Sequence, residues 1–422
     1  MVNVLLQVWS LLTGIVLIML GNGMHSTLIG LRGSIEGFSS AELAVITSGY
    51  FIGYLSGARL SPLMIKRVGH VRVFAALGSF TSAGLIAFPL ITEPWAWTVL
   101  RIMLGFCMSG VYVVAESWLN EASTNESRGK VLSAYMIAQT LGIIGAQGLL
   151  MLGDASTSVL FIGASILVSI SFAPILLSAS PVPASELVRP MRLRDLYASS
   201  HLGTVGIFLL GGIYASQIGM AAVYGTQIGL SSSNIALFVA TFFAGALALQ
   251  YPIGWLSDHM DRRKLIFAVC CVGTVSSIYG WTTNGSYWPL LIAAFITGGA
   301  TSPLYALFLA YTNDSLDTKD MAAASGGLVF TFGLGAIFGP LIAGWAMEGV
   351  GAFAFWLVMA MVFAIVAMYS VYCMTQRKRT LVEETESYLG VIPSSSYVAV
   401  EAAGTWSSEH AEEEREAEEN NT

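Results

Sequence analysis

The chain has 422 residues, of which 55% are apolar and only 11% are charged, and its mean hydropathy is +0.70. A soluble domain carries about a quarter charged residues, so this composition excludes a water-soluble protein and predicts one that crosses a membrane several times. The formal net charge of −7 arises in the C-terminal segment, because residues 380–422 hold eleven acids and one base, while the preceding residues carry a net +3.

Apolar runs of membrane length recur along the whole chain. A helix needs about 20 residues to cross the hydrocarbon core, and in lipid its backbone must satisfy its own hydrogen bonds. The first run is too long for a signal peptide and lacks a charged n-region, so we interpret it as a span. Twelve transmembrane helices are predicted: 4–29, 42–65, 72–91, 95–119, 130–152, 157–178, 201–228, 232–256, 264–283, 288–312, 321–346 and 351–374.

The spans divide into two groups of six. We predict an N-terminal six-helix bundle over 1–178, a linker over 179–200 that is rich in Pro, Ser and charge, and a C-terminal six-helix bundle over 201–376. The remainder, 377–422, is acidic and low in complexity, so we predict a disordered cytoplasmic tail. A partner-binding role for the tail is the alternative.

Basic residues predict the orientation. With both termini inside, sixteen of the nineteen Lys and Arg residues fall on the cytoplasmic side, only Arg32 falls outside, and Arg59 and Arg101 lie within spans. The positive-inside rule therefore places both termini in the cytoplasm. The protein is expected to be a multi-pass protein of the cell inner membrane.

The two halves repeat each other at a nearly constant offset. A shift of 193 positions places Gly105 on Gly298, Tyr112 on Tyr305 and Asn120 on Asn313. The halves therefore share one orientation and are related by pseudo-two-fold symmetry. Such a repeat predicts a binding site at the interface of the two bundles, near the membrane midplane.

Two motifs carry a family resemblance. The turn after the eighth span, GWLSDHMDRRK over 254–264, resembles the cytoplasmic loop motif of the major facilitator superfamily, and Arg101-xxx-Gly105 resembles its fourth-span motif. AESWLN over 115–120, together with Arg128-Gly129, is similar to the YcaD-like branch. The resemblance implies the major facilitator fold and a transporter that works by alternating access.

One departure concerns the direction of transport. Antiporters of the superfamily tend to carry a Gly-Pro motif in the fifth span, whereas here Gly339-Pro340 lies in the eleventh, and Gln147 occupies the matching position. The antiport signature is not met, and uptake and efflux both stay open.

Arg101 is the main candidate for contact with a solute. An ionisable group inside a membrane span is costly and marks a functional site by default. A guanidinium binds carboxylate or phosphate bidentately; the alternative is an Arg101 that holds two spans together by bonding carbonyls or Gln147. His25 is a candidate for proton coupling, or else a hydrogen-bonded structural histidine. The predicted substrate-binding residues are Asn22, His25, Arg101, Tyr112, Tyr214, Gln217 and Tyr305.

A second set of charges is predicted to gate the cytoplasmic end. Glu116 lies roughly 22 Å along the helix from Arg101, so we expect a separate partner, Arg59, in a structural or gating ion pair. A protonation site at Glu116 is the alternative. Asp258 is expected to pair with Arg262 and Arg263, and Glu121 with Arg67 or Arg72. The family resemblance implies that these contacts favour the outward-facing state, although topology alone also explains the bases.

These observations predict a secondary active transporter that moves a small organic solute, with a proton gradient as the expected driving force. The alternative is a transporter-like sensor that binds a solute without flux. The chain has no Walker lysine motif, no H-E-x-x-H and no G-x-S-x-G, so we expect neither ATP-driven transport nor an enzyme. The predicted partners are a small-molecule substrate, protons and the lipid bilayer; no cofactor, metal or nucleic acid is expected, and the protein is expected to be a monomer.

Overall fold

The structure is a computed structural model that describes residues 2–121, 123, 125–176, 191–283, 285–316, 318–376, 388, 390–393 and 395–407. Within these ranges the chain is helical, with short turns and no strand. The first half contains α1 (Val2–Ile35), α2 (Ser40–Val68), α3 (His70–Ala87), the 3-10 turn η1 (Phe88–Leu90), α4 (Pro94–Glu121), α5 (Asn125–Leu150) and α6 (Val159–Leu176). The second half contains α7 (Leu193–Ser199), α8 (His201–Gln227), α9 (Ser232–His259), α10 (Arg262–Thr282), α11 (Tyr287–Asn313), α12 (Thr318–Val350) and α13 (Ala354–Gln376).

Ten of these helices are long and apolar enough to cross a membrane, namely α1, α3, α4, α5 and α8 to α13. The predicted spans 42–65 and 157–178 correspond to α2 and α6, which run beside the ten. Helix α2 is more polar because it carries Glu42, Arg59, Lys66 and Arg67. The predicted linker contains the short helix α7, while residues 179–190 lie outside the described part of the chain.

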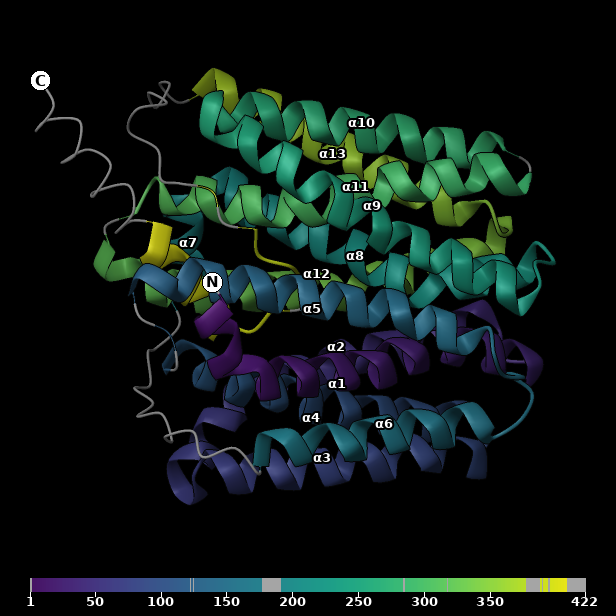
Figure 1. The fold of residues 1–422 in the computed structure, drawn as a ribbon. Coiled ribbons are helices and arrows are strands. Elements are labelled where there is room, and N and C mark those ends of the chain that lie inside the picture. Colours follow the sequence, from purple (N-terminus) through teal and green to yellow (C-terminus); the bar gives the residue numbers. More distant parts are fainter. Residues whose placement is uncertain are drawn as a thin grey trace, which may run out of the picture.

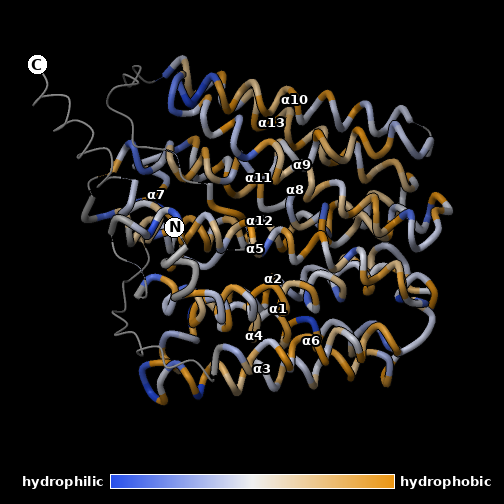
Figure 2. The backbone as a smooth tube through the Cα atoms, viewed as in Figure 1, coloured by the Kyte–Doolittle hydropathy of each residue, from blue (hydrophilic) through white to orange (hydrophobic). Residues whose placement is uncertain are grey.

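The long helices run side by side (Figure 1). Helices α3, α4 and α6 lie on one flank and α10 and α13 on the other, with α1, α2, α5, α8 and α12 between them. The N-terminus lies in the left part of the view. We call the left end of the bundle the basic end, because α2 ends there with Lys66 and Arg67 in its last turn and α10 begins there with Arg262 and Arg263. Hydrophilic residues collect at this end, whereas the helix bodies are mostly hydrophobic (Figure 2).

Glycines allow equivalent helix pairs in the two halves to touch backbone to backbone. A Cβ added at Gly105 of α4 would lie 1.9 Å from the Tyr50 carbonyl oxygen of α2. At the repeat-equivalent Gly298 of α11, it would lie 2.1 Å from the Phe242 carbonyl oxygen of α9. Small residues permit this approach in membrane helices, so the same device joins α2 to α4 and α9 to α11.

The two halves also contact each other at the end opposite the basic end, which we call the opposite end. Gln227 of α8 donates to the Ser40 hydroxyl of α2 at 2.6 Å, and the Ala41 N–H donates to Glu348 of α12 at 3.0 Å. A Cβ at Gly344 would lie 2.3 Å from the Ala44 Cβ. These contacts join α2 to α8 and α12 and close the opposite end between the halves.

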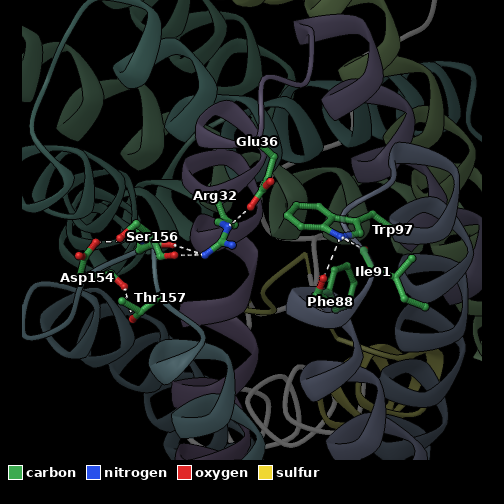
Figure 3. Close-up of polar contacts among 9 residues, drawn as sticks. Arg32, Glu36, Phe88, Ile91, Trp97, Asp154, Ser156 and Thr157 are labelled. Carbon is green, nitrogen blue, oxygen red and sulfur yellow. Dashed lines mark hydrogen bonds and ion pairs between the residues drawn. The ribbon is translucent and has the colours of Figure 1, made fainter.

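Local polar contacts order the turns at the opposite end (Figure 3). Arg32, the one base predicted to lie outside, pairs with Glu36 at 2.6 Å and donates to the Ser156 carbonyl oxygen. The indole of Trp97 donates to the carbonyl oxygens of Phe88 and Ile91 at 3.1 and 2.8 Å. The first contact attaches the α5–α6 turn to α1, and the second attaches η1 to α4.

At the basic end, part of the C-terminal segment packs between the halves. Residues 397–407 are helical, and Ser395, Ser396, Ala399 and Val400 are buried. The prediction that all of 377–422 is disordered is therefore wrong for 395–407, because these residues bury small apolar side chains against the bundle instead of remaining in water. Residues 377–387, 389, 394 and 408–422 lie outside the described part of the chain.

Candidate solute-binding site

A cavity lies between the two halves. Helices α1, α2, α4 and α5 supply one side, and α8, α9 and α12 supply the other. Its lining surface is mostly apolar, with one cation, two amide side chains, three hydroxyl side chains and four tyrosines. The polar lining residues are Asn22, Ser26, Thr27, Thr47, Tyr50, Tyr54, Arg101, Tyr112, Gln147 and Tyr214. An apolar cavity with a few convergent polar groups is the usual form of a small-molecule site.

Arg101 supplies the charge of this cavity. Its side chain is only 2% exposed, and its guanidinium carbon lies 4.7 Å from the centre of the Tyr50 ring, a cation–π contact. Among the described residues, its Nε has no hydrogen-bond partner and no acid forms an ion pair with it. Arg101 therefore keeps donor capacity and uncompensated positive charge next to the cavity.

His25 contacts the guanidinium of Arg101. Arg101 Nη1 lies 3.3 Å from His25 Nδ1, and His25 is completely buried against the ring of Phe88, 4.6 Å between centroids. Because a guanidinium only donates hydrogen bonds, Nδ1 accepts here and the imidazole is neutral. A proton added to Nδ1 would break this bond and place a second positive charge beside Arg101.

Two further cavities continue from the first towards the basic end. The second shares Ile143, Tyr214, Ile218, Phe243 and Pro393 with the first. The third shares Thr140, Ala246, Ser302 and Ile392 with the second and reaches Asp258 at the end of α9. The three cavities follow α5 and α9 from Arg101 to the basic end, and residues of the C-terminal segment line each of them.

The predicted substrate-binding residues divide into three groups. Asn22, Arg101, Tyr112 and Tyr214 line the first cavity. Gln217 lines the second and donates to Thr301 at 2.9 Å. His25 and Tyr305 line neither: His25 supports Arg101, and Tyr305 packs edge-on against Phe332 at 5.1 Å. Five of the seven residues thus line one of these two cavities, and helix rotation decides which residues face them.

The predicted ion pair between Arg59 and Glu116 does not form in this structure. Glu116, only 2% exposed, accepts hydrogen bonds from the Tyr135 hydroxyl at 2.7 Å and from the Ser396 N–H at 3.0 Å. Arg59 is exposed, and its guanidinium lies 4.7 Å from the centre of the Phe330 ring on α12. Glu116 is buried and Arg59 is exposed, and the two side chains contact different partners.

The other predicted pairs lie at the basic end. Arg262 pairs closely with Asp314, while its distance to the predicted partner Asp258 is 3.9 Å. Arg263 pairs with Asp261 at 3.2 Å, its neighbour two positions earlier. The main link of this cluster therefore joins α10 to the end of α11.

The remaining prediction at this end paired Glu121 with Arg67 or Arg72. Both arginines are exposed, and the Glu121 side chain lies outside the described part of the structure.

Sequence reasoning missed two kinds of lining residue. Tyr50 and Tyr54 lie one helical turn apart on α2, and this i, i+4 spacing was the available signal. Pro393 lines both the first and the second cavity. No signal in the sequence indicated it, because it belongs to a segment that looks like a solvated tail.

The part of the chain that the structure describes has ten helices of membrane length, a cavity between its two halves and glycine-mediated packing repeated in both halves. These are features of a multi-pass membrane transporter. The model of the Major Facilitator Superfamily matches residues 11–225 and 202–399, and the chain belongs to this family. The resemblance seen in its motifs is thereby confirmed, as is the predicted all-α membrane fold.

Individual relatives agree with this assignment. The chain is 26% identical to the uncharacterized MFS-type transporter YcaD of Escherichia fergusonii over 342 residues, covering 80% of this chain and 88% of the relative. It is 27% identical to an uncharacterized MFS-type transporter of Enterobacter sp. (strain 638) over 346 residues, with the same coverage. Among solved structures it is similar in fold to the nucleoside transporter NupG, with a TM-score of 0.70 at 14% identity over 89% of this chain and 100% of that one.

Proposed function

We propose that this transporter moves a small organic anion by alternating access, with Arg101 as its anion-binding group. The observation that supports this most is the position of Arg101, a permanently charged side chain at 2% exposure beside a cavity between the two halves. A buried charge without a counter-charge is expensive, and a bound carboxylate would relieve that cost.

The neighbours of Arg101 favour the same class of solute. Asn22 and Gln147 add amide groups to the cavity, and Gln147 Oε1 has no hydrogen-bond partner among the described residues. Tyr50 and Tyr112 supply aromatic surface. A solute with one carboxylate, a few hydroxyl or amino groups and an apolar or planar body would meet all three features.

We further propose that a proton accompanies the anion, with His25 as its carrier. The neutral imidazole accepts from Arg101, so its protonation becomes favourable only when an anion compensates the two adjacent positive charges. This arrangement would couple proton binding to solute binding.

We assign the basic end to the cytoplasm, by the positive-inside rule. The protein would then lie in the cell inner membrane with both termini in the cytoplasm. In this structure the halves would be separated on the cytoplasmic side, with the C-terminal segment between them, and in contact on the other side.

The first test is a thermal-shift screen of the purified full-length protein. The panel pairs each carboxylate with its amide or alcohol analogue, so that only the charge differs. We expect carboxylates to raise the unfolding temperature and their neutral analogues to leave it unchanged, because only an anion compensates Arg101. A panel in which only neutral or cationic solutes stabilise the protein would contradict the proposed substrate class.

The second test measures flux of the best stabilising carboxylate into liposomes that contain the protein. An inwardly directed proton gradient should accelerate uptake relative to equal pH on both sides. Flux that ignores the gradient would contradict proton coupling but not transport. Tight binding without any flux would indicate a sensor, provided that the opposite end of the same protein is shown to open.

A further inference from the structure

The C-terminal segment occupies the gap between the halves at the basic end, and its contacts reach both of them. On the first half, the Tyr54 hydroxyl donates to the Ser395 carbonyl oxygen at 3.2 Å. On the second half, the Tyr388 N–H donates to Asp258 at 2.8 Å, and Gln250 donates to the Tyr388 hydroxyl at 2.8 Å. We call the described residues of this segment, 388, 390–393 and 395–407, the plug.

Glu116 holds the start of the plug helix. Its carboxylate accepts from the Ser396 hydroxyl, from the Ser396 N–H at 3.0 Å and from the Ala399 N–H at 3.3 Å. The first N–H groups of a helix have no intrahelical partner, and the helix dipole favours an anion at that position. This contact accounts for a buried acid in α4 that the proposed substrate site does not use.

Two aromatic side chains of the plug, one before its helix and one near the end of it, also pack closely against the bundle. A Cβ at Gly129 of α5 would lie 2.6 Å from the ring of Trp406, and a Cβ at Gly254 of α9 would lie 2.6 Å from the ring of Tyr388. Two glycines, one in each half, thus leave room for two aromatic side chains of the plug.

The plug also bounds the route to Arg101. Pro393 lines the first and second cavities, and Ile392 lines the second and third. A solute moving along α5 and α9 between the basic end and Arg101 would meet these residues.

We infer that the plug is a built-in inhibitor of the transport cycle. While docked, it obstructs the route at the basic end and prevents the halves from approaching there, which alternating access requires. The hydrogen bonds to the Glu116 carboxylate determine the fraction of molecules in which the plug is docked. A negative charge added at Ser396 would lower that fraction. The consequence for flux rests on the proposed transport function, but docking itself can be tested without it.

The first experiment measures access to the route in purified full-length protein. Cys107, Cys270, Cys271 and Cys373 are replaced by Ala, and Ala246→Cys is introduced in α9, where it lines the second and third cavities. The rate of labelling with a bulky maleimide then reports undocking. In this background Ser396→Asp should accelerate labelling about tenfold, because it places a second carboxylate against Glu116.

The matched rescue variant combines Ser396→Asp with Glu116→Gln. The amide oxygen of the glutamine can still accept from Tyr135 and from the helix N-terminus, and the repulsion is gone, so labelling should return towards the parent rate. Equal unfolding temperatures of the three proteins show that the bundle is intact. Parent-like labelling of Ser396→Asp, or a double variant as open as the single one, would overturn the inference.

The second experiment fixes the plug covalently. Ser395 Oγ lies 3.4 Å from the Met136 sulfur, so Ser395→Cys and Met136→Cys should lie close enough for a short bifunctional thiol reagent with a reducible linker to bridge them. Ser82→Cys with Ser165→Cys, whose hydroxyls are 2.7 Å apart within the first half, is the control pair. If the control pair links and the plug pair does not, docking is wrong.

Flux separates this inference from the proposed function. With the carboxylate selected by the thermal-shift screen, the linked plug should abolish flux and reduction should restore it, while Ser396→Asp should transport faster than the parent. If no solute is transported by any variant, the proposed function fails, and labelling and cross-linking still decide docking. Undiminished flux with the plug linked would contradict the inference that the docked plug inhibits transport.

Discussion

Arg101 shows how one residue's neighbours determine its role. Alone in an apolar segment, it is compatible either with a structural bond or with solute binding. The structure gives it a cation–π contact with Tyr50 and a neutral histidine, but no acid among the described residues. A purely structural arginine at this depth would be paired, because unpaired burial is expensive.

The first prediction concerns this charge. Arg101→Gln should weaken binding of the selected carboxylate by about 10- to 150-fold, which corresponds to about 1.5–3 kcal/mol for a hydrogen bond to a charged group. Arg101→Lys should retain part of the affinity, because it keeps the charge but loses the planar fork. Titration calorimetry measures both. Arg194→Gln, which removes an exposed base, is the control, and an equal loss there would mean that total charge, not the site, attracts the anion.

A second prediction concerns Glu401 in the plug helix. Burial raises the pKa of this carboxyl group when the plug is docked. Protonation of Glu401 therefore favours docking. The stabilisation of the docked plug by Glu401 is fully present below the ordinary pKa of a glutamate, and it is lost as the pH rises through the raised pKa.

Glu401→Gln should accordingly slow maleimide labelling at Ala246→Cys and flatten its dependence on pH. The parent rate, divided by the rate of the Ser396→Asp variant at the same pH to remove the ionisation of the thiol itself, should rise as the pH increases across that interval. A ratio that is independent of pH, or a Glu401→Gln variant that labels faster than the parent, would contradict this assignment.

At the scale of the helix, the repeat in the sequence corresponds to a packing device. Gly105 and Gly298 occupy equivalent positions and allow the same backbone contact, α4 with α2 and α11 with α9. A few identical residues at a constant offset could be predicted from sequence alone, and so could their location on helices. The distance of closest approach could not, because it depends on how both helices are rotated.

Substitution of these glycines is the third prediction. Gly105→Ala or Gly298→Ala should destabilise the protein by about 1–3 kcal/mol, since the added methyl group would overlap a carbonyl oxygen of the neighbouring helix. Gly148→Ala on α5 is the matched control, because nothing lies within 4 Å of its Cβ position. Thermal unfolding in detergent measures all three. Equal unfolding temperatures for the three variants would contradict the contact.

At the scale of the whole molecule, the structure captures one conformation. The halves touch at the opposite end through Ser40, Gln227 and Glu348, while the plug separates them at the basic end. Transport by alternating access requires the first set of contacts to break.

The fourth prediction follows from that requirement. Ser40→Cys with Gln227→Cys, bridged by a short bifunctional thiol reagent, should abolish flux, and a reagent with a cleavable linker should allow recovery. Ser82→Cys with Ser165→Cys, treated in the same way within the first half, should leave flux unchanged. Persistent flux with the first pair bridged would show that the opposite end need not open.

The sequence by itself determined the membrane class, the positions of the helices, the repeat and the family. These depend on hydropathy, on the spacing of turns and on local motifs, all of which are local properties of the chain. It also identified Arg101 and Glu116 as costly buried charges.

Only the tertiary structure decided which partners these charges have. Arg59 contacts the ring of Phe330 on α12, and Glu116 binds a segment 280 positions later in the chain. Composition marked that segment as disordered, because in isolation it cannot bury enough apolar surface to fold. The two halves supply the missing surface, and that contribution exists only once the helices have packed.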